Sequence, residues 1–487
     1  MELELSLDPD DAARLLRLAR LTPLKTGRPR TRAVRIVWHD SPDRTLAQQG
    51  LALAEQRPGW RLERLHPGAE TWSPAEPAPL LQAARDSAGL GHALPNPLVP
   101  VAAFDGRSRI ITLSSEAGSM TLTLLTGSVH TVAGGHPVSR LRLEGAESAV
   151  RDLALALCED VRLAVPQASL AAEAFAIASG MPPPPRHLGA PDLPADLSVS
   201  AAFAHVVGHL TDVILHFAPT AADGRDGPEP VHQMRVAVRR LRSAIKVFRS
   251  AVQCPAVDAV DASVKALGKQ LAPTRDWDVF VTETLAAVAD AFPAEPRLQR
   301  LLTAAQRRRR TCHDALATFL RAPEFRRLGI ELACLAAGQD WHATLAEAEA
   351  TFFDVPLDVF AARVLNRRLK KLAQVDDELA ELEPRALHAV RLRAKRLRYA
   401  AEIFATLYPV KATSRFIYRL TTVQNRLGAL NDGTVARTLL DELAGTSGKL
   451  AFASGIVLGF AGAHSKRARS RSVRAWQKFR RAEPFWE

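Results

Sequence analysis

The chain has 487 residues, with 64 Lys and Arg against 52 Asp and Glu and a formal net charge of +12. That length allows two or three domains with cores of their own. Residues 1–180 carry 19 Lys and Arg against 20 Asp and Glu, so the positive excess lies in the remainder, where a polyanionic partner is expected. The acidic start MELELSLD is unlike a secretory signal, and the longest apolar run, 450–463, is too short to span a membrane; we therefore expect a cytoplasmic protein.

The first 165 or so residues predict strands with some helix. TRAVRIVWHD, SMTLTLLTG and VSRLRLEG alternate apolar and polar residues, and glycine-rich turns such as VAGGHP separate them. A helix is expected over 151–165. The prolines of 181–194 predict an extended linker, which divides the chain into domains at 1–180 and 195–487.

After the linker the pattern is helical throughout, in two units at about 197–340 and 343–487. The helices expected in the first unit span 197–217, 230–252, 256–271, 276–291, 296–320 and 322–338. Those expected in the second span 343–381, 384–407, 411–427, 432–445, 448–464 and 466–480. Each boundary is expected to hold within about three residues.

The two helical units share a repeated segment. VHQMRVAVRRLRSAIKVF (231–248) returns as LHAVRLRAKRLRYAAEIF (387–404), 156 positions later, and LAPTRD (271–276) returns as LGALND (427–432) at the same offset. Two motifs that keep one register indicate a duplication. Asp276 and Asp432 end these motifs and are expected to cap the helices that follow.

What is repeated is a stripe of cations. Val231, Met234, Val238, Leu241, Ile245 and Phe248 recur at helical spacing and predict a buried seam. One position further on, and so beside the seam, lie the cations of the two copies: His232, Arg235, Arg239, Arg242 and Lys246, then His388, Arg391, Lys395 and Arg398. Like charges three and four residues apart repel, so the stripe predicts an anion ligand; the alternative is that these side chains only cover apolar surface.

Further basic residues are candidates of lower rank. These are Lys265, Lys269, Arg307, Arg310, Arg367, Lys370 and Lys371. His232 and His388 each fall in a first helical turn, where free N–H groups attract phosphate oxygens, so binding is expected to strengthen towards acid pH. The alternative for each is a histidine that packs on a neighbouring helix.

Residues with catalytic or metal-binding spacing are not found in the sequence. There is no glycine-rich phosphate loop, no HExxH and no Ser/His/Asp arrangement, and neither a metal nor a cofactor is expected. The cysteines, Cys158, Cys254, Cys312 and Cys334, lack metal-ligand spacing and predict buried free thiols.

The paired VHQMRVAVRRLR and LHAVRLRAKRLR segments, each followed by LAPTRDWDV or LGALND, resemble the CHAD family over about 195–487. The resemblance implies two pseudo-symmetric four-helix bundles with a basic central channel that binds inorganic polyphosphate. Ala272 departs from the pattern, because the family usually has the glycine that the second copy keeps as Gly428.

The N-terminal part resembles a CYTH, or triphosphate tunnel, domain. MELELSL, WHDSPDRTLAQQGLAL, GWRLERL and SLAAEAFAIASG carry the likeness. Glu2, Glu4 and Glu144 are kept, but the lysine of the opening motif is Ser6 and the later arginine and lysine positions are lost. Arg140 and Arg142 stand where further acids would be expected.

The sequence therefore predicts a multidomain protein: an α+β antiparallel tunnel-like barrel, then an all-α domain of two four-helix bundles. We expect it to bind polyphosphate without catalysis, in the cytoplasm and in association with polyphosphate granules. One alternative is an inorganic triphosphatase that retains CYTH activity. Another is a nucleic-acid-binding module, which the scarcity of aromatic residues among the cations disfavours.

Overall fold

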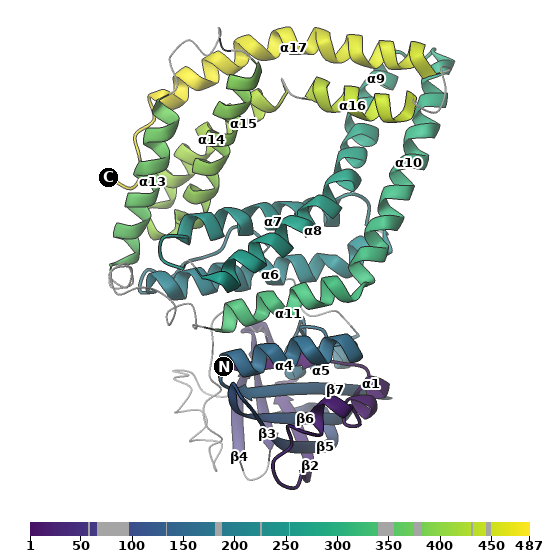
Figure 1. Cartoon of the computed structure of the whole chain (residues 1–487), viewed down its shortest axis with the longest axis vertical. Coiled ribbons are helices and arrows are strands. Elements are labelled where there is room, and N and C mark those ends of the chain that lie inside the picture. Colours follow the sequence, from purple (N-terminus) through teal and green to yellow (C-terminus); the bar gives the residue numbers. More distant parts are fainter. Residues whose placement is uncertain are drawn as a thin grey trace. The chain divides into compact units, whose positions relative to one another are not determined.

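In a computed structural model of the chain, the residues described are 1–56, 59–65, 97–132, 134–180, 188–224, 226–252, 254–338, 355–374, 382, 384–429, 432–444 and 450–487. Contacts divide the chain into two compact units (Figure 1): Met1–Gly189 with Ala322–Ala343, and Ala190–Arg321 with Thr344–Glu487. Half of the expected linker, 181–187, lies outside the described residues.

The first unit is built on one seven-stranded antiparallel sheet, in the order β1-β7-β6-β5-β2-β3-β4. Its strands are β1 (Glu2–Ser6), β2 (Arg30–Asp40), β3 (Leu51–Gln56), β4 (Gly59–Arg64), β5 (Val99–Ser115), β6 (Gly118–Thr131) and β7 (Gly134–Gly145). The three alternating segments of the sequence form β2, β6 and β7. The sheet confirms the expected α+β antiparallel class and fits a CYTH-like half-barrel.

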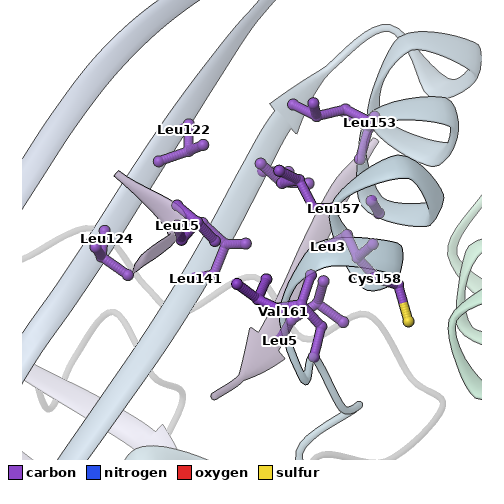
Figure 2. Packing of buried hydrophobic residues seen from close by; sticks show 14 of the residues in the cluster. Leu3, Leu5, Leu15, Leu122, Leu124, Leu141, Leu153, Leu157, Cys158 and Val161 are labelled. Atoms are coloured by element: carbon purple, nitrogen blue, oxygen red, sulfur yellow. The ribbon is translucent and has the colours of Figure 1, made fainter. Parts of the chain in front are cut away.

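Helices cover both faces of this sheet. They are α1 (Pro9–Leu15), α2 (Thr45–Gln48), α4 (Glu147–Asp160), α5 (Leu170–Ser179) and the 3-10 turn η1 (Ala19–Leu21). On one face, Leu3, Leu141 and Leu157 belong to the apolar core in Figure 2, which α1 and α4 close. On the other, Phe104 packs with alanines of α5. The expected helix 151–165 starts earlier, at Glu147, and ends at Asp160.

Helix α11 (Pro323–Ala337) also belongs to the first unit, although it follows the first helical repeat in the chain. Ile330 and Cys334 are buried in the same core as α4. The expected helix at 322–338 is therefore present, and part of its apolar face is buried in the core of the sheet domain.

The second unit consists of helices. They are α6 (Val199–Asp223), α7 (Glu229–Phe248), α8 (Pro255–Val279), the π-helix η2 (Phe280–Leu285), α9 (Ala286–Ala291), α10 (Pro296–Arg321), α13 (Leu357–Ala373), α14 (Pro384–Ile403), the 3-10 turn η4 (Ala405–Leu407), α15 (Val410–Ala429), α16 (Asp432–Ala444) and α17 (Ala451–Arg480). Of the expected helix 343–381, residues 343–354 and 375–381 lie outside the described residues.

These helices pack in the same succession twice. α6 contacts α7, α7 contacts α8 and α8 contacts α10; likewise α13 contacts α14, α14 contacts α15 and α15 contacts α17. The two sets meet where α7 contacts α14, and the rings of Phe248 and Phe404 lie 5.7 Å apart there. Because Phe404 follows Phe248 by 156 positions, the sequence repeat is also a structural repeat.

Two expected helix breaks are wrong. α8 continues through LAPTRD, so Asp276 lies inside a helix and caps nothing. Pro273 removes one backbone donor there, but the buried residues Leu271, Thr274 and Trp277 anchor the helix on both sides of it. The expected helices 448–464 and 466–480 form the single helix α17, in which no glycine or proline follows Gly462.

α6 is long and apolar enough to cross a membrane by length and composition. Of its most apolar window, 56% is buried inside the protein, which is typical of a core helix. The four cysteines are free and buried, as expected.

Candidate anion-binding site

Helix α7 separates apolar residues from cations along its length. The six residues of the expected seam, from Val231 to Phe248, are each at most 2% exposed. Arg235, Arg239 and Arg242 are half-buried beside this seam, and Lys246 is exposed. A position beside a buried seam, and not opposite it, brings a cation against the neighbouring helices. The stripe therefore lies at the margin of the packing between α7, α8 and α14.

A large cavity lies along this stripe. Its volume is about 1090 Å³, and its walls come from α7, α8, α13 and α14. Thirteen of the lining residues are Lys or Arg, and no Asp or Glu is among the described residues that line it. The basic lining residues are Arg235, Arg239, Arg242, Lys246, Arg249, Lys265, Lys269, Arg363, Arg367, Arg368, Lys371, Lys395 and Arg396.

Nine of the sixteen residues predicted from the sequence line this cavity. They are Arg235, Arg239, Arg242, Lys246, Lys265, Lys269, Arg367, Lys371 and Lys395. The other seven are not among its lining residues: His232, Arg307, Arg310, Lys370, His388, Arg391 and Arg398. Arg307 and Arg310 are exposed on α10, and Lys370 is exposed on α13.

The two histidines differ in their surroundings. His232 is half-buried, and burial, followed by the positive charge of Arg275, lowers its pKa. His388 is exposed on α14. Contact of either residue with an anion therefore stays a prediction.

The second copy of the stripe is partly neutralised inside the protein. Glu402 occupies the position that Lys246 holds in the first copy, 156 residues earlier. It is buried between Arg398, at 2.9 Å, and Arg240, at 3.2 Å. Arg398 is thus held by a carboxylate and lies over the ring of Tyr399, with 4.9 Å between the guanidinium carbon and the ring centroid. The two copies of the cation stripe are therefore unequal.

The two copies nevertheless place one arginine in the same way. Arg235 Nη1 donates to the backbone oxygen of Ala272 at 3.1 Å. In the second copy, Arg391 Nη2 would lie 3.4 Å from a Cβ added at Gly428, which is the position equivalent to Ala272. Although Ala272 departs from the family pattern, Arg235 lies against Ala272 just as Arg391 lies against Gly428.

Two acids on α8 lie next to the lining cations. Asp276 Oδ1 is 3.4 Å from Arg235 Nη2, and Asp261 Oδ1 is 3.0 Å from Arg242 Nε. Burial raises the pKa of Asp276 above its usual value, although Arg235 and Arg275 act in the opposite direction. Each acid is an internal counter-ion that a bound anion would have to replace.

Most of the remaining cations are crowded together. Burial, with Arg239 and Arg391 nearby, lowers the pKa of Lys395 to about 8. Burial and then Arg396 lower the pKa of Arg368 to about 10. Such shifts mean that burial and the neighbouring cations disfavour the charged forms of these side chains, and that an anion placed among them would relieve the repulsion.

Unused hydrogen-bonding groups occur at the same place. Arg239 Nε and Ser243 Oγ are buried and make no hydrogen bond within the described part of the chain, and both residues line the cavity. Leaving a buried donor unpaired costs free energy, so a ligand with oxygen acceptors would complete these interactions. Cation density and open donors thus both favour an oxyanion.

Arg249, Arg363, Arg368 and Arg396 line the cavity but were not predicted as ligands. Arg249 continues the spacing of the stripe by one step, so the periodicity already pointed to it. Arg368 and Arg363 are on α13, and only the approach of α13 to the first repeat brings them to this cavity.

Known proteins resemble the helical unit that holds the cavity. The CHAD domain family model matches residues 201–441, and a crystal structure of the CHAD domain from the plant Ricinus communis is similar, with 30% identity and a TM-score of 0.52. That likeness covers 62% of this chain and 98% of the plant domain. The chain belongs to the CHAD family. All residues that line the cavity fall within the matched CHAD segment.

Two curated relatives come from Mycobacterium tuberculosis, the proteins MT2285 and Rv2226. Each is 28% identical over 240 residues, which are 48% of this chain. The chain matches 44% of their length, so the likeness concerns less than half of those proteins.

Proposed function

We propose that the CHAD unit binds inorganic polyphosphate in the cavity between α7, α8, α13 and α14, and that it does so without catalysis. One observation carries this proposal: thirteen Lys and Arg, and no Asp or Glu among the described lining residues, surround a space of about 1090 Å³. CHAD domains as a family are associated with polyphosphate, which agrees with this choice of anion.

The shape of the cation set favours a linear anion over a small one. The lining cations come from four helices and extend along α7 from Arg235 to Arg249. On an α-helix, 14 steps correspond to roughly 21 Å, far longer than a single phosphate group. A chain with a negative charge on every unit can contact successive cations along this length.

The aromatic residues of the cavity disfavour a nucleic acid. Phe360 and Tyr399 are the aromatic lining residues in the described part of the chain, and both are buried in helix packing. Strand-binding proteins without sequence preference stack bases on accessible rings. Polyphosphate has no bases and needs only the guanidinium and ammonium groups that are present.

Calorimetric titration of the full chain with long-chain polyphosphate tests the proposal. If about six phosphate contacts form, the logarithm of the affinity should fall with the logarithm of the salt concentration at a slope of roughly −4, as for single strands. Duplex DNA at equal charge concentration should not displace the polyphosphate. Displacement by DNA, or an affinity that does not depend on salt, would contradict the proposal.

The location of the protein in the cell is part of the same proposal. A protein that holds polyphosphate in this way would be found in the cytoplasm, with polyphosphate granules. Fluorescent tagging of the chain, in cells with and without stored polyphosphate, would show whether it follows the polymer.

A further inference from the structure

The sheet of the first unit carries a cluster of opposite charges at its β1–β7 edge. Glu2 pairs with Glu144 across the two strands, and Glu4 pairs with Arg142. Residues two apart on a strand share a face, so these side chains and that of Arg140 lie on one side of the sheet. The retained acids of the CYTH pattern and the two unexpected arginines are therefore in one place.

Each of the three carboxylates is within ion-pair distance of an arginine. Arg142 lies 3.2 Å from Glu2, 3.6 Å from Glu4 and 3.9 Å from Glu144, measured between guanidinium nitrogens and carboxylate oxygens. Arg140 Nε lies 3.3 Å from Glu4 Oε1. Arg140 also forms an ion pair with Glu173 of α5. The cluster is thus continuous from the edge strand to the helix.

Charges on this face balance when the neighbouring strands are included. Arg140 of β7 is the cross-strand partner of Leu125 on β6, which pairs with Ser108 on β5, which in turn pairs with Arg32 on β2. Cross-strand partners face the same side of a sheet, so Arg32 shares the face of Arg140. In the same way, Arg142 is connected through its cross-strand partners Thr123 and Ile110 to Arg30, which shares its face. Two more arginines therefore share the face with the four carboxylates. A divalent cation would enter a face that is already neutral.

The chemistry of the face does not suit a divalent metal ion. Such an ion needs several carboxylate oxygens directed at one point at roughly 2.0–2.6 Å. Here a guanidinium occupies the space between the oxygens, and among the described residues no group of three His, Cys, Asp or Glu could hold a metal. The two guanidinium groups of Arg140 and Arg142 together carry the charge of one divalent ion.

Helix α5 covers the same face. Phe104 lies four residues before Ser108 on β5, an even number, and so faces the same way as Arg140. Ala171 and Ala174 of α5 are buried with Phe104 in one apolar cluster. The ion pair between Arg140, whose side chain is 10% exposed, and Glu173 joins α5 to the charged end of the face.

We propose that Arg140 and Arg142 replace a divalent cation on this face, which makes the N-terminal unit a metal-independent structural domain. Glu2, Glu4 and Glu144 act as partners for these arginines, and not as metal ligands, while Arg140 also pairs with Glu173 of α5. The inference rests on the first unit alone, so the outcome of the polyphosphate titrations does not bear on it.

Binding of Mn²⁺ to the full chain, followed by the loss of the free-ion electron paramagnetic resonance signal, tests this proposal. The wild-type protein should not bind Mn²⁺ at millimolar concentration, and its melting temperature should not change with Mn²⁺ or with a chelator. Arg142→Gln removes a half-exposed guanidinium and should raise the Mn²⁺ affinity by at least about tenfold. Arg109→Gln, on the opposite face of the same sheet, is the matched control and should change nothing.

Two results would overturn the proposal. One is Mn²⁺ binding by the wild-type chain that Glu4→Gln abolishes, since the carboxylates would then be open to metal. The other is a folded Arg142→Gln variant, with an unchanged circular dichroism spectrum, that gains no Mn²⁺ affinity over Arg109→Gln. The wild-type measurement decides the first point even if a variant does not fold.

Discussion

Asp276→Asn is expected to tighten the binding of polyphosphate. Asp276 Oδ1 lies 3.4 Å from Arg235 Nη2, and the two side chains are 39% and 25% exposed. The acid would therefore compete with a phosphate oxygen for the same guanidinium. Asparagine keeps the size of the side chain and removes the charge.

The size of this effect follows from the exposure of the pair. Two unit charges about 4 Å apart interact by about 1 kcal/mol in water, and exposed ion pairs contribute roughly 0.2–1 kcal/mol. Relief of that competition should improve the dissociation constant about two- to fivefold. A much larger gain would mean that the acid also repels the bound anion directly.

The pH dependence of binding follows from the same residue. Burial raises the pKa of Asp276, so this carboxyl takes up its proton at a higher pH than an ordinary aspartate. Acidification then removes its charge, and wild-type affinity should increase. Because the folded pKa lies above the unfolded value, ionisation of Asp276 costs stability as pH rises, so Asp276→Asn should not be less stable at pH 7.

Calorimetry of the wild type and two variants at pH 7 and at pH 5 is the assay. Asp223→Asn is the control, because Asp223 pairs with Arg321 at 3.1 Å outside the cavity. Asp276→Asn should bind more tightly at pH 7 and gain less on acidification than the other two proteins. Equal behaviour of Asp276→Asn and Asp223→Asn would refute the reasoning.

Three further outcomes are expected. Since the pKa of Lys395 is lowered to about 8, its charge is lost as pH rises through that value, so affinity should fall between pH 7 and 9 in titrations of the wild type and not of Lys395→Arg. Asp278 is fully buried against Arg309 and His313, so Asp278→Ala should lower the free energy of unfolding in urea by about 3–5 kcal/mol. Asp314 is exposed, so the control Asp314→Ala should change it little, and equal losses in the two variants would contradict the expectation. Ile330→Ala should destabilise the first unit by about 2–5 kcal/mol, measured by faster hydrogen exchange in β1 and β7; faster exchange confined to the second unit would be the contrary result.

Local periodicity was enough to predict α7. Its seam from Val231 to Phe248 and its cations depend on helix geometry alone, and both are found as expected. The repeat likewise predicted that α14 would be equivalent to α7. The fold class could be predicted because the segments of period two and of helical period lie in separate parts of the chain.

Contacts between distant elements could not be predicted in this way. Arg363 joins the cavity because α13 approaches the first repeat, and Arg398 is withdrawn from it because Glu402 lies one helical turn away. The sequence of α11 likewise does not show that Ile330 and Cys334 belong to the core of the sheet domain, which precedes them by about 170 residues. The break expected before Asp276 failed for a related reason, since burial on both sides of Pro273 outweighs the lost hydrogen bond.

The central claim is that the cavity cations, and not basic residues in general, bind polyphosphate. Two variants of the full chain with equal charge change separate these possibilities: Lys265→Glu with Lys269→Glu at the cavity, and Arg307→Glu with Arg310→Glu on α10, all four side chains being exposed in the wild type. Calorimetric titration with long-chain polyphosphate should show at least about a tenfold loss of affinity for the first variant and a change of less than about threefold for the second. Equal losses in the two variants, or no loss in the first, would contradict the claim.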